Sequence, residues 1–180
     1  MNIPNMISLF RIFLIPVFIY FFVTGSGDNR VVIPVIIFII SGISDVLDGY
    51  IARKANMQTK LGAVLDPLAD KLMLVTALAC FAYYNYIPDW IVFVVAAKEL
   101  FMIGGSAVAW YRGIVTHANV WGKMATFLFH ISIVSFLFSD MLALTFLFIS
   151  IAVSFVALVK YIQITLAKKQ KLDSQPSTKQ

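Results

Sequence analysis

Residues 45–70 read DVLDGYIARKANMQTKLGAVLDPLAD and hold four of the nine acidic residues of the chain, between two apolar segments. The four are Asp45, Asp48, Asp66 and Asp70. A carboxylate near the centre of a membrane helix costs roughly 2.5 to 3.5 kcal/mol on insertion scales. Four unpaired carboxylates would therefore cost roughly 10 to 14 kcal/mol in total. A divalent cation together with a charged ligand would offset this cost.

The composition is that of a polytopic membrane protein. Of the 180 residues, 61% are hydrophobic and only 13% are charged, whereas about a quarter are charged in soluble domains. Six apolar stretches are close to the roughly 20 residues that span a bilayer. We place them at residues 6–23, 31–52, 61–84, 89–111, 122–139 and 141–165. The prediction is an all-α fold with six transmembrane helices in one catalytic domain, residues 1–167, followed by a polar tail, residues 168–180, that we expect to be disordered.

The opening NIPNMISLFRI is less apolar than the span that follows, which favours a short interfacial helix at the N-terminus. Within it we expect Arg11 to reach lipid head groups; the alternative is that it reaches into a cytoplasmic site. Basic residues gather in alternate loops, which predicts that both termini face the cytoplasm. The net charge of +5 is explained better by anionic lipid head groups than by nucleic acid.

Helical spacing places the acidic and small residues of each motif helix on one stripe. The two stripes are Asp45, Asp48, Gly49 and Ala52, and Gly62, Asp66 and Asp70. Two antiparallel helices would bring the stripes face to face, just below one membrane surface. Four converging carboxylates suit Mg²⁺, Mn²⁺ or Ca²⁺ and could hold two ions that clamp a phosphoryl group. Arg53 is placed to bind phosphate with two hydrogen bonds. The alternative is that the acids only form ion pairs between helices with nearby basic residues, Lys71 among them.

The pattern D-x2-D-G-x2-A-R-x8-G-x3-D-x3-D, from Asp45 to Asp70, resembles the signature of the CDP-alcohol phosphotransferases, membrane enzymes of phospholipid synthesis. The resemblance implies transfer of a phosphatidyl group from CDP-diacylglycerol to an alcohol, with release of CMP. It implies that Asp45, Asp48, Asp66 and Asp70 bind two Mg²⁺ or Mn²⁺ ions and that Asp70 is also the general base. It also implies that Gly49, Ala52, Arg53 and Gly62 bind the CDP-lipid, and that the protein is a homodimer of the inner (plasma) membrane with a cytoplasmic active site.

The N-terminal NIPNMISLFR is similar to bacterial family members that use glycerol 3-phosphate, the phosphatidylglycerophosphate synthases. Such an acceptor needs cations for its phosphate, and Lys98, Arg112 and Lys123 are the candidates. Ala125 stands where those synthases have a second lysine, and this variant also occurs in cardiolipin synthases of the family, whose acceptor is phosphatidylglycerol. We assign no catalytic role to His117 or His130.

A divalent-cation transporter is the alternative from another class, because intramembrane acids also mark ion pathways. It would explain the four carboxylates. It would not explain the glycine, alanine and arginine spacing, nor why these acids lie near one surface.

Overall fold

The computed structural model describes residues 3–54, 62–111 and 120–173, and every regular element in these ranges is an α-helix. The helices are α1 (Ile3–Thr24), α2 (Asn29–Lys54), α3 (Gly62–Tyr83), α4 (Asp89–Tyr111), α5 (Val120–Ser135) and α6 (Asp140–Asp173). The predicted all-α class is confirmed for the described residues, and each predicted span overlaps one helix. That all six helices cross the membrane stays a prediction.

Three helix ends differ from the prediction. Residues 3–24 form one uninterrupted helix, so no separate N-terminal helix precedes the first span. Helix α5 ends at Ser135, four residues early, because the chain turns there through bonds from Phe136 N to Ile133 O and from Phe138 N to Ser135 O. Helix α6 continues to Asp173, six residues into the predicted tail. Lysine and glutamine are good helix formers, so a polar sequence can extend a helix. The single-domain assignment stays a prediction.

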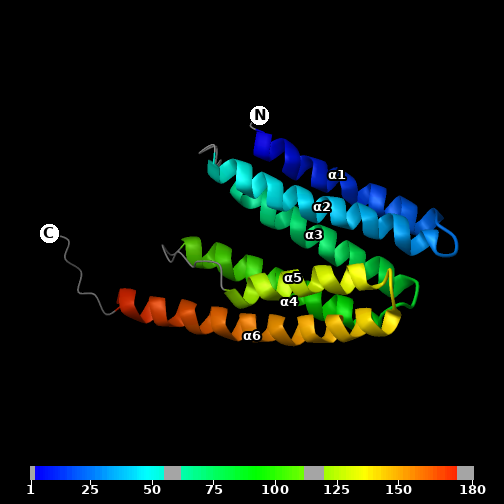
Figure 1. The fold of residues 1–180 in the computed structure, drawn as a ribbon. Coiled ribbons are helices and arrows are strands. Elements are labelled where there is room, and N and C mark those ends of the chain that lie inside the picture. The colour runs from blue at the N-terminus through cyan, green and yellow to red at the C-terminus, as the bar shows by residue number, and fades with distance from the viewer. Residues whose placement is uncertain (1–2, 55–61, 112–119, 174–180) are drawn as a thin grey trace.

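The helices form two groups of three, α1 to α3 and α4 to α6 (Figure 1). Helix α1 packs along both α2 and α3, and α5 packs along α6 in the most extensive contact between any two helices. The α3–α4 contact joins the groups, whereas α2 and α5 touch over a short stretch. The start of α1 and the end of α6 lie at the same end of the bundle, and the turns after α1, α3 and α5 lie at the other (Figure 1).

Aromatic side chains close the bundle at the end with these turns. Phe22 of α1 lies 5.0 Å from Phe81 of α3 between ring centroids, and Phe81 stacks on Phe136 at 4.3 Å. Tyr86 meets both Phe81 and Phe136. Arg30, at the start of α2, lies over the ring of Tyr84 at 4.2 Å. Elements from both groups are therefore tied together here, and the space between the groups lies further along the bundle.

Among the described residues, three helices are long and apolar enough to cross a membrane, over Met6–Thr24, Asn29–Leu47 and Asp140–Thr165. Helix α5 is apolar but shorter. Helices α3 and α4 carry Asp70, Lys71, Lys98 and Glu99 among their described residues, and these charges lower the hydropathy of both helices. The described part of the chain is thus all-helical and contains candidate membrane-spanning segments.

Candidate active site

A cavity of about 1150 Å³ lies between the two groups of helices and is lined from α2, α3, α4, α5 and α6. Its charged lining residues are Asp45, Asp70, Lys71, Lys98, Glu99 and Lys123. Its walls further along α2, α5 and the turn after α5 are apolar, with Phe38, Ile39, Ile43, Phe127, Ile131, Val134 and Phe138. Small-molecule pockets usually measure about 300 to 1,000 Å³. The cavity is therefore large enough for an extended amphipathic ligand with a charged head.

Asp45 enters the cavity from α2 and is paired with an arginine from α1. The Nη1 atom of Arg11 lies 2.5 Å from Oδ1 of Asp45. The Arg11 side chain is only 1% exposed, whereas that of Asp45 is 42% exposed. The expectation that Arg11 reaches lipid head groups is wrong, because its guanidinium is buried between helices. The alternative, that Arg11 reaches into the site, agrees with this contact.

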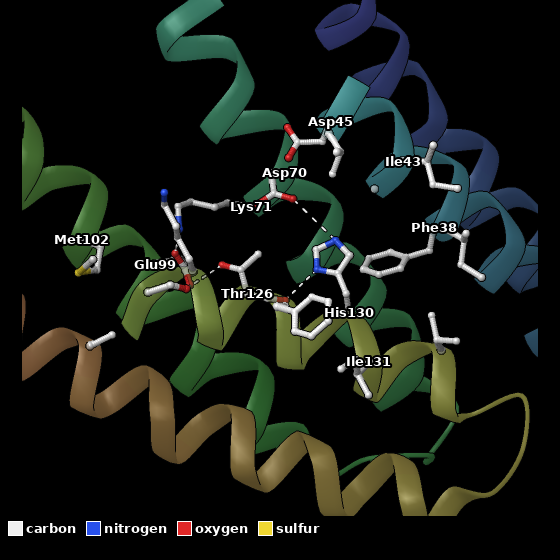
Figure 2. Close-up of a pocket in the computed structure, with 18 of the residues that line it drawn as sticks. Phe38, Ile43, Asp45, Asp70, Lys71, Glu99, Met102, Thr126, His130 and Ile131 are labelled. Atoms are coloured by element: carbon white, nitrogen blue, oxygen red, sulfur yellow. Dashed lines mark hydrogen bonds and ion pairs between the residues drawn. The ribbon is translucent and has the colours of Figure 1, made fainter. Parts of the chain in front are cut away.

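Asp70 enters the same cavity from α3 and faces a histidine from α5. Its Oδ1 atom is 4.0 Å from Nε2 of His130. His130 is held by a hydrogen bond of 2.8 Å between its Nδ1 and the carbonyl oxygen of Thr126, and its ring lies 4.9 Å from that of Phe38. Figure 2 shows Asp45, Asp70 and His130 pointing into one space.

Sequence reasoning missed the position of His130. A buried histidine is usually hydrogen-bonded, and this one is, but it also lies beside the proposed base. Gly42 of α2, three residues before Asp45, lies beside the His130 ring. A Cβ atom at Gly42 would stand 3.3 Å from Cδ2 of His130, so a glycine leaves room for the ring.

Glu99 of α4 connects two lysines on the cavity wall. It forms ion pairs with Lys71 of α3 and with Lys98, its neighbour in α4. The Glu99 side chain is 7% exposed, and that of Lys98 is 11% exposed. Lys98 is therefore largely buried at the cavity wall, and Lys71 forms an ion pair with Glu99.

Four of the residues singled out from the sequence therefore meet at one cavity, namely Asp45, Asp70, Lys98 and Lys123. Ala125 is 2% exposed and is not part of the wall of this cavity. The motif side chains of Asp48, Gly49, Ala52, Arg53, Gly62 and Asp66 lie outside the described part of the structure, although their backbones belong to α2 and α3. Arg112 and His117 lie outside the described residues altogether. The roles of all these residues stay predictions.

The described residues supply part of a carboxylate site for a divalent cation. Asp45 and Asp70 come from facing helices into one cavity, and carboxylate oxygens are the ligands that Mg²⁺ and Mn²⁺ prefer. Within residues 3–54, 62–111 and 120–173, no three acidic, histidine or cysteine side chains that the structure describes form a group able to hold a metal. The other two predicted ligands, Asp48 and Asp66, belong to the side chains that are not described. The predicted site for two cations therefore stays a prediction.

Comparisons with known proteins agree with the signature. The sequence model of the CDP-alcohol phosphatidyltransferase family matches residues 1–159. A CDP-diacylglycerol–glycerol-3-phosphate 3-phosphatidyltransferase of Bacillus subtilis is 39% identical over 136 residues, covering 69% of this chain and 70% of the relative. The Haemophilus influenzae protein of the same description is 29% identical over 185 residues, covering 96% and 97% of the two chains.

A second group of relatives has another description. A putative cardiolipin synthase of Mycobacterium tuberculosis is 36% identical over 131 residues, covering 71% of this chain and 60% of the relative. Both groups fall within the family that the 26-residue motif predicts, and the family match covers all six helices except the end of α6. This chain belongs to the CDP-alcohol phosphatidyltransferase family.

Proposed function

We propose that this protein is an enzyme that transfers the phosphatidyl group of CDP-diacylglycerol to glycerol 3-phosphate, giving phosphatidylglycerophosphate and CMP. The observation that carries the proposal is the meeting of Asp45 and Asp70, from two helices of the family motif, in one cavity with Lys98 and Lys123. Bacterial relatives described as using these two substrates are 29 to 39% identical to this chain.

Asp70 is the proposed general base. Its carboxylate takes the proton from the acceptor hydroxyl as that oxygen attacks the phosphorus next to the diacylglycerol. The bond from this phosphorus to the bridging pyrophosphate oxygen breaks, and CMP leaves with that oxygen. Two Mg²⁺ or Mn²⁺ ions held by Asp45, Asp48, Asp66 and Asp70 would supply positive charge to the pyrophosphate oxygens.

The two ends of the cavity suit the two parts of a CDP-lipid. Gly49, Ala52, Arg53 and Gly62 are the proposed contacts of the cytidine diphosphate, because small side chains permit close approach and arginine binds phosphate. The apolar walls from α2 and α5 would contact the acyl chains. A charged cavity end beside apolar walls supports a substrate that is half lipid and half nucleotide.

Lys98, Arg112 and Lys123 are the proposed contacts of the acceptor phosphate. Lys98 and Lys123 line the cavity from different helices. The alanine at position 125, which pointed toward cardiolipin synthases, does not form part of the cavity wall. Its replacement of a lysine is therefore weaker evidence against a phosphorylated acceptor than the sequence alone suggested.

Cardiolipin synthesis is the second candidate, because relatives with that description are 36% identical to this chain. Phosphatidylglycerol would then be the acceptor, and its hydroxyl would lie beside Asp70 where that of glycerol 3-phosphate lies in the first proposal. In either case we expect a homodimer in the inner membrane, with both termini and the cavity mouth at the cytoplasmic face. The excess of Lys and Arg in alternate loops supports this orientation.

The decisive experiment offers a panel of acceptors to purified protein with labelled CDP-diacylglycerol and Mg²⁺ or Mn²⁺, and identifies the product by mass. Phosphatidylglycerophosphate and CMP formed only with glycerol 3-phosphate would support the proposal. Cardiolipin formed only with phosphatidylglycerol would support the second candidate. No CMP with any alcohol would contradict both and favour cation transport.

A further inference from the structure

The charged residues of the cavity include a cluster of Lys71, Glu99 and Lys98. The proposed reaction gives a role to Lys98 but not to Lys71 or Glu99. Glu99 is 5% exposed and makes ion pairs with both lysines. All three residues line the cavity, from α3 and α4. Lys71 directly follows Asp70, and Figure 2 shows both lying at the charged end of the cavity with Glu99.

The cluster has one more positive charge than it has negative charges. A single lysine would be enough to balance Glu99 and to join α3 to α4. Each ammonium has three hydrogen-bond donors, so both lysines keep donors free of Glu99 that can face the cavity. The Lys71 side chain is 26% exposed and that of Lys98 is 11% exposed, so both ammonium groups are partly shielded from water. An anion bound from the cavity would meet both positive charges, whereas a neutral ligand would not.

We propose that Lys71 and Lys98 together bind the phosphate of the acceptor, and that Glu99 is a positioning residue that holds the two ammonium groups side by side. This inference rests on the proposed function and adds Lys71 and Glu99 to its residues. It makes the lysine pair the feature that selects a phosphorylated alcohol over a neutral one. Because Lys71 neighbours Asp70, a phosphate held there keeps the hydroxyl of a three-carbon acceptor in the same cavity as the base.

The test compares the steady-state constants of four variants with those of the wild type. Lys71→Gln and Glu99→Gln remove one charge each, and Lys160→Gln on α6, which is exposed and outside the cavity wall, is the matched control. Losing a charged hydrogen bond changes affinity by about 10- to 100-fold. We expect Lys71→Gln to raise the KM for glycerol 3-phosphate by about this factor and the KM for CDP-diacylglycerol by less than about threefold. We expect Glu99→Gln also to raise the KM for glycerol 3-phosphate. Lys71→Arg, which keeps the positive charge, should have a KM for glycerol 3-phosphate close to that of the wild type.

A structural role for the cluster predicts a different pattern. If Glu99 only joins α3 to α4, Lys71→Gln and Glu99→Gln lower the Tm and affect both KM values equally. That result would overturn the inference. CMP release from wild-type protein with glycerol 3-phosphate is measured in the same series, so a failure of the proposed function itself is recognised separately.

A measurement on wild-type protein does not depend on how the variants fold. The purified enzyme is treated with an amine-acylating reagent, and each lysine is quantified by mass spectrometry. We expect glycerol 3-phosphate, but not glycerol, to slow acylation of Lys71 and Lys98 while Lys160 reacts at an unchanged rate. Equal acylation of Lys71 with and without glycerol 3-phosphate would contradict the inference.

Discussion

The surroundings of Asp70 come from three helices. Its own helix, α3, directs it into the cavity, α2 contributes Asp45, and α5 contributes His130 with Nε2 at 4.0 Å. The neighbouring acid favours cation binding at this point, and the histidine occupies the side away from Asp45 (Figure 2). The residue is therefore well placed both to bind a cation and to accept a proton.

Replacing Asp70 by asparagine keeps the size of the side chain but removes the base. We expect CMP release to fall by about 10³-fold, because general bases contribute about 10² to 10⁴ in rate. Binding of CDP-diacylglycerol, measured by ligand-dependent thermal stabilisation, should remain. Asp140→Asn, at the start of α6 and outside the cavity wall, is the control and should keep wild-type turnover. Near wild-type turnover in Asp70→Asn would show that another group is the base.

Lys123 is an exposed residue of α5 at the cavity. We expect Lys123→Ala to raise the KM for glycerol 3-phosphate about tenfold, because a charged hydrogen bond to phosphate contributes about 1.5 to 3 kcal/mol and exposure reduces this. The KM for CDP-diacylglycerol should change far less. Initial-rate measurements with each substrate varied in turn provide both constants. Equal increases in the two KM values would mean that Lys123 acts only through the general positive charge of the protein surface.

At the scale of single residues, sequence reasoning succeeded where helical spacing within one chain segment was enough. Asp45 and Asp70 were predicted to share a cavity because their stripes lie on consecutive helices. The burial of Arg11 and the position of His130 beside Asp70 were not predicted, because their neighbours come from helices distant in sequence. No local pattern specifies that α1 presents Arg11 to α2, or that α5 presents His130 to α3.

At the scale of elements, the Arg11–Asp45 pair joins α1 to the motif helix α2. Arg11→Met would leave Asp45 without this partner and remove a buried guanidinium. We expect a loss of about 2 kcal/mol in stability, less than for a fully buried pair because Asp45 is half-exposed, and a fall of about 5 °C in the Tm in detergent. Asp45→Asn and Arg11→Met should then combine less than additively, as residues in contact do. Strict additivity in thermal unfolding would mean that the two residues are not coupled.

The aromatic contacts at the turn end belong to the same scale. Phe81 is fully buried and touches Phe22, Tyr86 and Phe136. We expect Phe81→Ala to cost about 3 kcal/mol through lost packing and to lower the Tm by about 10 °C. Both KM values should stay unchanged, because the cavity wall does not include Phe81. The matched control is Phe93→Ala, a residue that is 74% exposed and should have little effect on the Tm.

Helix positions were predictable because apolar runs and turn residues alternate along the chain. The residues at which the helices end were harder to predict. Helix α5 stops at Ser135 although Phe136, Leu137 and Phe138 remain apolar, because these residues form the turn into α6. Helix α6 continues past its apolar part because a helix outside a membrane needs helix-forming residues, not hydrophobic ones.

At the scale of the whole molecule, function depends on the separation between the two groups of helices. The aromatic cluster ties the groups together at the turn end, and α2 and α5 diverge enough to leave a cavity of about 1150 Å³. Sequence patterns predict which face of a helix is polar, but not how far apart two packed helices lie. The size of the cavity and its apolar walls could therefore be seen only in the folded chain.

The central claim is that Asp45 and Asp70, from different helices, serve one cation site. Electron paramagnetic resonance of Mn²⁺, titrated into purified wild-type protein, Asp45→Asn, Asp70→Asn and the control Asp140→Asn, tests it most directly. We expect both cavity variants to bind Mn²⁺ at least about tenfold more weakly than the wild type, because each loses a charged ligand, while Asp140→Asn binds like the wild type. Wild-type Mn²⁺ affinity in both Asp45→Asn and Asp70→Asn would contradict the account.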